Sequence, residues 1–194
     1  MSRTAKYERS TAETSIRLEL ELDGEGESTI DTGVGFFDHM LTHIAKHGGL
    51  DLTLHARGDT HVDEHHLVED VGLCLGTAIN KALGDKRGID RFGVSFVTMD
   101  EAMARTIIDL SGRSYLVFNA GFSRGSINGF ALETVKEFFR AVSTEGRMNL
   151  HIALLYGDNA HHQVEAIFKS FGRALRAASA RTGGDAIPST KGTL

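Results

Sequence analysis

The sequence has little cysteine, little proline and no long hydrophobic run, and each scarcity narrows what the protein can be. A single cysteine, Cys74, rules out an internal disulfide framework and is typical of a reducing compartment. No apolar run approaches the ~18 residues that a membrane-spanning helix needs, and the first ten residues lack the apolar segment of a secretory signal. The 26 acidic residues outnumber the 21 lysines and arginines, a balance that disfavours electrostatic binding of nucleic acid. We therefore expect a cytoplasmic protein that binds neither nucleic acid nor a membrane.

The chain repeats itself once. The segments 65–84 and 161–178 both carry His-His, Val, Glu and Gly, and these residues keep one constant offset of 96 positions. Upstream, residues 38–41 match residues 136–139 at an offset of 98. A chance match of this order and spacing is implausible, so the sequence predicts two structural repeats.

The repeats run over about 1–92 and 93–187 and together make a single catalytic domain over residues 1–194. The only proline, Pro188, begins a polar C-terminal tail. Helical spacing of apolar residues marks 37–44, 68–82, 132–142 and 164–175, and alternation of apolar with polar residues marks 14–22, 50–54, 94–99, 105–110, 115–119 and 150–154. Strands grouped with paired helices predict an α+β fold, in which the helices pack on one face of each small sheet.

Histidine is abundant, with ten residues, of which seven lie between His39 and His66. His65 and Glu69 are four residues apart on a predicted helix, so they share one stripe and can chelate one cation. His66 is turned about 100° away and is free to bind a second metal ion. The second repeat carries the same arrangement in His161, His162 and Glu165.

The simplest assembly pairs the two helix starts pseudo-symmetrically, and the aligned residues His39 and Glu137 add one ligand to each metal. The predicted sets are His65, Glu69, Glu137 and His162 for one ion, and His39, His66, His161 and Glu165 for the other. Imidazole and carboxylate donors without cysteine favour Mn, Fe or catalytic Zn over structural Zn. The spacing is not His-Glu-x-x-His, so it does not indicate a zincin protease.

The plain alternative for these residues is a solvated helix start, but two pairs with the same downstream glutamate at the same offset argue against it. Among the other histidines, His47 is a further candidate for the site, whereas His43 is expected at the surface. His55, His61 and His151 have no supporting pattern and are expected to be structural or exposed. Cys74 lies within an apolar helix pattern and is expected in the core.

The chain resembles the imidazoleglycerol-phosphate dehydratases. The matching segments run in order over almost the whole chain, at 36–47, 58–70, 86–93, 109–113, 161–169 and 188–192. The doubled His-His-x-x-Glu is the most specific of them. The resemblance implies a duplicated α+β unit of the ribosomal protein S5 domain 2-like type, with helices packed between the sheets. It also implies two Mn2+ per active site and a homo-oligomer of 24 subunits with active sites at subunit interfaces.

The implied reaction is the dehydration of imidazoleglycerol phosphate to imidazole acetol phosphate in histidine biosynthesis, catalysed by a carbon–oxygen lyase. Two metals can hold the imidazole through both nitrogens and favour its anion, which expels the neighbouring hydroxide. A carboxylate removes the adjacent proton, and the enol becomes the ketone. By resemblance Glu13 is the acid/base candidate, and the predicted metal ligands are the family's own, although some members carry His where this chain has Glu137.

The phosphate of such a substrate needs cations and hydrogen-bond donors. By family match the substrate-binding candidates are Arg91, Arg113, Lys169, Ser189, Thr190 and Lys191, and His47, on the same helix stripe as His39, is added to them. Lys169 follows His161 by eight residues on one predicted helix, so it faces the metals. Two rival interpretations remain: a dimetal hydrolase that activates a bridging water, and a metal-binding oligomer whose ions join subunits.

Overall fold

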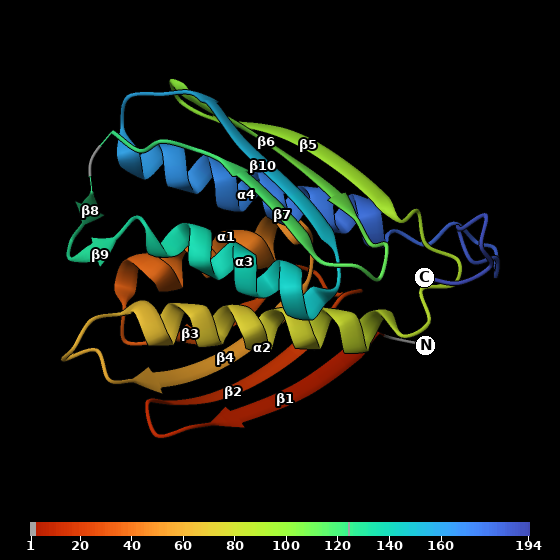
Figure 1. Cartoon of the computed structure of the whole chain (residues 1–194), viewed down its shortest axis with the longest axis horizontal. Helices are drawn as coiled ribbons and strands as arrows, with labels where there is room; N and C mark the ends of the chain where they lie inside the picture. The colour runs from red at the N-terminus through yellow and green to blue at the C-terminus, as the bar shows by residue number, and fades with distance from the viewer. Residues whose placement is uncertain (1–2, 124) are drawn as a thin grey trace.

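The described part of the chain, residues 3–123 and 125–194 of the computed structural model, forms two four-stranded sheets with four helices between them (Figure 1). The first sheet contains, in spatial order, β1 (Thr4–Ser10), β2 (Thr14–Glu21), β4 (Asp51–Gly58) and β3 (Ser28–Asp31). The second contains β5 (Phe92–Met99), β6 (Ala102–Asp109), β10 (Asn149–Tyr156) and β7 (Tyr115–Asn119). The helices are α1 (Gly35–Gly48), α2 (His65–Leu83), α3 (Thr134–Gly146) and α4 (Ala160–Ser179).

The two sheets share one topology. In each sheet the second strand in the chain pairs antiparallel with both neighbours, and the short outer strand, β3 or β7, runs parallel to the strand beside it. A small hairpin of β8 (Ser126–Ile127) and β9 (Phe130–Ala131) is added in the second half alone. The expected duplicated α+β unit, with its helices packed between the sheets, is confirmed. Within the described residues, no helix is long and apolar enough to cross a bilayer.

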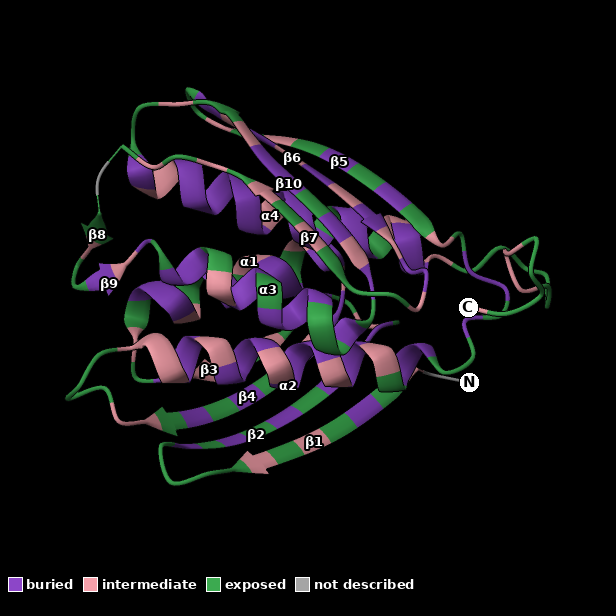
Figure 2. Ribbon diagram, viewed as in Figure 1, coloured by how far each residue is buried: buried purple, intermediate pink, exposed green. Residues whose placement is uncertain are grey.

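Each sheet buries the face that meets the helices and exposes the other, as Figure 2 shows by the alternation along β1, β2 and β5. In β2 the buried positions are Ile16, Leu18 and Leu20, and the residues between them are polar and exposed. This period of two follows from the pleat of a strand. It also fixes the register, because a shift by one residue would turn the apolar set toward water.

The second helix of each half packs against the first helix of the other half: α2 lies against α3, and α4 lies against α1. Repeat-related glycines allow these helix backbones to touch. A Cβ at Gly76 would lie 2.7 Å from the carbonyl oxygen of Val142, and a Cβ at Gly172 would lie 2.8 Å from that of Ile44. Each helix also contacts the sheet of its own half, so the helices of the two halves together form one layer between the sheets.

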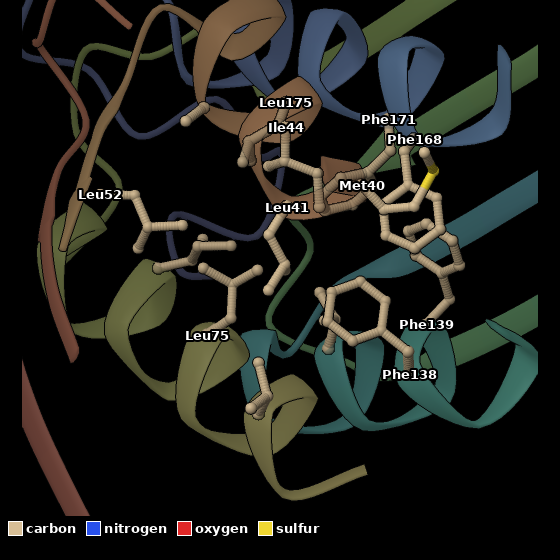
Figure 3. Close-up of a cluster of buried hydrophobic side chains, with 14 of the residues drawn as sticks. Met40, Leu41, Ile44, Leu52, Leu75, Phe138, Phe139, Phe168, Phe171 and Leu175 are labelled. Carbon is tan, nitrogen blue, oxygen red and sulfur yellow. The ribbon is translucent and has the colours of Figure 1, made fainter. Parts of the chain in front are cut away.

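One continuous core results from this helix packing (Figure 3). Met40 and Ile44 of α1, Phe138 of α3 and Phe168 of α4 meet there, and each has at most 1% of its surface exposed. The Phe138 and Phe168 rings stack with centroids 5.4 Å apart. Cys74 is fully buried in the same core, as its apolar surroundings in the sequence predict. This core holds α1 and α4 rigidly side by side, which matters because both helices carry histidines of the candidate site.

Candidate metal and substrate site

Both His-His pairs stand at the first turn of a helix. The Asp63 carboxylate accepts the backbone N–H of His65 at 2.8 Å, and the Asn159 side chain accepts that of His161 at 2.9 Å. Short polar side chains at this position satisfy N–H groups that have no partner within the helix. The local sequence therefore fixes where α2 and α4 begin, and with it the place of the histidines.

A cluster of imidazole and carboxylate groups lies between α1 and α4. The Glu165 carboxylate is its centre, 3.1 Å from Nε2 of His161 and 3.4 Å from Nε2 of both His39 and His43. Lys169 Nζ lies 2.5 Å from Glu165 Oε1, the same oxygen that His43 approaches. In the described ranges, the group of His39, His43 and Glu165 is the one place where three or more such ligand atoms lie within 4.8 Å of one another.

The charge states in this cluster suit metal binding. Burial by itself would raise the pKa of Glu165, but the hydrogen bond from Lys169 and the nearby positive groups lower it to about 2. Burial lowers the pKa of His43 to about 4, against the attraction of Glu165. At neutral pH the cluster thus holds an ionised carboxylate beside a neutral imidazole, and these are the protonation states in which such groups bind metals.

The repeat-related place between α2 and α3 is more open. His65 Nε2 lies 3.8 Å from Glu69 Oε2, on the shared stripe that the spacing predicts. The Arg140 guanidinium pairs with Glu137 and reaches to 4.0 Å from Glu69. Glu137 and Glu69 therefore both approach one positive group, which in the structure is the side chain of Arg140.

The second histidine of each pair is held by a carboxylate through Nδ1. His66 Nδ1 lies 3.1 Å from Asp59, and His162 Nδ1 lies 2.7 Å from Glu101. These hydrogen bonds raise the pKa of both rings, Asp59 being the main cause for His66 and Glu101 for His162. Among the described residues, no contact joins His66 to the Glu165 cluster or His162 to Glu69. One chain therefore brings together only part of each predicted ligand set.

The substrate candidates fall into two groups. His47 stacks on His43 with ring centroids 5.7 Å apart, and Lys169 contacts Glu165, so both border the α1–α4 cluster. Arg91 instead donates to the Pro188 carbonyl at 2.8 Å and to Asp109 at 2.7 Å, far along β5 from Lys169. The end of the tail, at Leu194, meets Gly112 beside Arg113, so the tail residues Ser189, Thr190 and Lys191 lie with Arg91 and Arg113 rather than with Lys169.

Glu13 lies in the turn between β1 and β2, and its side chain is more than half exposed. Its carboxylate is 3.8 Å from His66 Nδ1, which places the predicted acid/base residue beside a predicted metal ligand. His55, His61 and His151, which were expected to be structural or exposed, are exposed.

One expectation about the histidines is wrong. His43 does not lie at the surface: only 15% of its side chain is exposed, because α4 covers it with Glu165. Its spacing of four residues from His39 was the available signal. Asp59 and Glu101 were not identified either; Asp59 belongs to the Gly-Asp that follows the strand in both repeats, whereas no sequence pattern marks Glu101.

Comparison with known proteins points to one family. A family model described as imidazoleglycerol-phosphate dehydratase matches residues 32–175. A relative of that name from an Exiguobacterium species is 54% identical over 99% of this chain and 98% of its own length, and one from Hydrogenovibrio crunogenus is 54% identical over 99% and 100%.

The crystal structure of the dehydratase from Staphylococcus aureus matches with a TM-score of 0.83 at 40% identity, covering 92% of this chain and 99% of that one. The Pyrococcus furiosus structure, in complex with (S)-C348, matches with 0.84 at 36% identity, covering 97% and 100%. The chain therefore belongs to the imidazoleglycerol-phosphate dehydratase family, a family of hydro-lyases of histidine biosynthesis.

Proposed function

We propose that this chain dehydrates imidazoleglycerol phosphate to imidazole acetol phosphate with two divalent cations per active site, and that Mn2+ is the natural ion. The observation that carries the proposal is the cluster of His39, His161 and Glu165 between α1 and α4. Imidazole and carboxylate donors without a thiolate are the set that Mn, Fe and catalytic Zn accept. When bound, such cations favour the anionic form of a coordinated imidazole.

The two ligand sets in our proposal are completed by a second subunit. His39, His161 and Glu165 hold one cation. His65, Glu69 and Glu137 hold the other after the Arg140 side chain leaves Glu137 and Glu69. His66 and His162 then supply the fourth ligands across a subunit interface. This division is supported by the described contacts of a single chain, which join neither histidine to the other donors.

Glu13 moves the proton in this reaction. Its carboxylate borders His66 and remains open to solvent, so a substrate can reach it. The carbon next to the imidazole loses hydroxide, Glu13 takes the proton from the adjacent carbon, and the resulting enol becomes the ketone. Lys169 and His47 border the α1–α4 cluster around Glu165 and bind the substrate's polar groups. Arg91, Arg113 and the tail residues Ser189, Thr190 and Lys191 bind the phosphate from another subunit, since they lie away from Lys169 within one chain.

A homo-oligomer, expected to contain 24 subunits, is further supported by a difference between the two sheets. The outer face of β5 exposes Phe92, Val94 and Phe96, each more than half exposed, and the outer face of β7 exposes Tyr115. The strand in the corresponding place of the first sheet, β1, exposes polar and charged residues instead, at Thr4, Lys6 and Glu8. The outer face of the second sheet thus exposes large apolar side chains that the first sheet lacks, and exposed apolar patches mark interaction surfaces. We assign it to contact with a second copy.

The deciding experiment measures turnover of imidazoleglycerol phosphate by protein stripped of metal and then titrated with Mn2+. We expect ketone product to appear as about two ions bind per chain, the number that the two ligand sets provide. Two tightly bound ions without product would overturn the dehydratase function and favour the hydrolase or the structural-metal interpretation. Full turnover without any bound metal would overturn the metal-dependent mechanism.

A further inference from the structure

In each His-His pair, the second histidine has one carboxylate at its Nδ1 atom. Asp59 lies at Nδ1 of His66 and Glu101 lies at Nδ1 of His162. We propose that Asp59 and Glu101 are positioning residues, which hold His66 and His162 in the tautomer that presents the Nε2 lone pair to a divalent cation. This inference rests on the proposed metal-dependent function and adds two residues to it.

The chemistry follows from the two nitrogens of imidazole. A neutral ring carries its proton on one nitrogen and a lone pair on the other. A carboxylate at Nδ1 fixes the proton there, so Nε2 is left as the acceptor. Histidines that ligate metals usually donate their other ring N–H to a carboxylate, a carbonyl or water, and loss of that partner typically weakens metal binding 10- to 100-fold.

Glu101 is itself held in place, which an incidental surface pair would not require. One of its oxygens accepts the backbone N–H groups of Asp158 at 3.1 Å and Asn159 at 2.8 Å, and the other accepts from His162. Asn159 caps α4 at the same point. The carboxylate therefore links the β5–β6 turn to the helix start and sets the orientation of the His162 ring.

The strand registers show that Glu101 occupies the place of Glu13 in the other repeat. Leu20 of β2 pairs with Leu52, and Ile108 of β6 pairs with Leu150, where Leu52 and Leu150 are repeat counterparts. Glu13 precedes Leu20 by seven residues and Glu101 precedes Ile108 by seven residues, so the two glutamates are repeat counterparts. The two repeats therefore carry a glutamate at the same point of the fold, in the turn before the second strand.

The two glutamates have different surroundings, which separates their roles. Within the described residues no backbone N–H donates to the Glu13 carboxylate, which stays 3.8 Å from His66 Nδ1 because Asp59 already occupies that ring atom. Glu101 is fixed by three hydrogen bonds. The geometry leaves Glu13 free to transfer a proton, whereas Glu101 is committed to positioning His162.

The test is a set of Mn2+ binding isotherms on the metal-stripped full-length protein, measured by the electron paramagnetic resonance signal of free Mn2+. Asp59→Ala and Glu101→Ala remove the two carboxylates, and Asp158→Ala is the matched control, since that side chain has no contact with a histidine in the described structure. We expect two sites in the wild-type protein. Each of the first two variants should weaken one site by about 10- to 100-fold, whereas Asp158→Ala stays within about twofold.

Conservative variants separate positioning from charge. Asp59→Asn and Glu101→Gln keep an oxygen that can accept the Nδ1 proton, so they should recover part of the lost affinity. Glu101→Ala also loses the bonds to Asp158 and Asn159, so thermal melting in chelator checks its fold, and Asp59→Ala provides the test without that complication. Wild-type affinity at both sites in both alanine variants would overturn the inference and leave the proposed function standing. A wild-type protein that takes up no Mn2+ would overturn both.

Discussion

At the scale of single residues, Glu165 shows how a buried carboxylate is kept charged. Only 6% of its side chain is exposed, and an unpaired charge so placed would cost several kcal/mol. Three imidazoles and the Lys169 ammonium surround it. The residue therefore acts as the fixed anion around which one side of the site is organised.

Replacing Glu165 with Gln should remove one metal site and most of the activity. The amide keeps the shape but loses the charge that Lys169 and the proposed cation face, so bound Mn2+ should fall from two to one per chain and turnover should fall by more than ~100-fold. Atomic absorption on dialysed protein and a turnover assay measure the two effects. Arg173→Gln, on the same helix but outside the cluster, is the control; a Glu165→Gln protein with two tightly held ions would refute the assignment.

Asp23 makes a second residue-scale prediction, on acid stability. Arg3 and Arg181 both bind its carboxylate, at 2.5 Å and 2.9 Å, and the hydrogen bond from Arg3 is the main reason that its pKa lies well below the usual range. Because the folded pKa is depressed, the stabilisation is complete above the unfolded value, about 3.9, and is lost as pH falls below it. Asp23→Asn should lower the free energy of unfolding by about 1 kcal/mol at pH 7 and much less near pH 2.

Urea unfolding of Asp23→Asn and the wild type between pH 2 and 7 measures this effect. The exposed Asp85, which pairs with Arg87, provides the control Asp85→Asn, for which we expect little change at any pH. The prediction fails if Asp23→Asn and the wild type lose stability in parallel as the pH falls.

Part of the site was predictable from residues alone. Helical spacing was enough to pair His161 with Glu165, because a stripe on a helix is a local property, and the repeat alignment of His39 with Glu137 added His39 to them. The pairing of Glu101 with His162 was not predictable, since it depends on a turn 61 residues away in sequence. Nor does the spacing show that Lys169 and Arg91 lie apart, because that depends on how β5 runs past α4.

At the scale of elements, the two close helix contacts depend on residues without side chains. Gly76 and Gly172 stand at the same place in the two repeats, and each faces backbone atoms of the partner helix. Backbone atoms cannot rotate away as a flexible side chain can. A Cβ added at Gly76 must therefore move α2 away from α3, and a Cβ added at Gly172 must move α4 away from α1.

Gly76→Ala and Gly172→Ala should each destabilise the protein by about 1–2 kcal/mol, although alanine favours a helix by about 1 kcal/mol over glycine. The melting temperature should fall by several degrees for each variant. Gly35→Ala, at the start of α1, is the control: nothing lies within 4 Å of its added Cβ, so we expect no loss. Thermal melting that places all three variants at or above the wild type would contradict the role of these contacts.

The elements themselves were predictable where one face is strongly apolar. The alternation in β2, β4 and β10 and the helical spacing of all four helices match the structure, with ends that differ by a few residues. β1 and β3 were not predicted. β1 exposes charged residues and Ala5 is its one buried residue, and β3 is four residues long, so neither has enough alternation to be seen without its neighbouring strand.

At the scale of the whole molecule, we expect copies of the chain to assemble through the apolar outer face of the second sheet. Phe96 stands near the middle of β5 and is more than half exposed, so a charge there should be buried if two copies meet on this face. Phe96→Glu should reduce the oligomer to smaller species in light scattering after size exclusion. Glu8→Gln changes the corresponding position of β1 and should leave the assembly intact; an unchanged Phe96→Glu oligomer would place the interface elsewhere.

The packing of each helix against a helix of the other half has a consequence for how the molecule could be divided. A polypeptide with one sheet and two helices would leave the inner faces of both helices without a partner, because α1 needs α4 and α2 needs α3. Such a half could cover its apolar surface only by pairing with another half. The fold therefore has the architecture of a dimer whose two chains have been joined end to end, and separately expressed halves are expected to fold only in each other's presence.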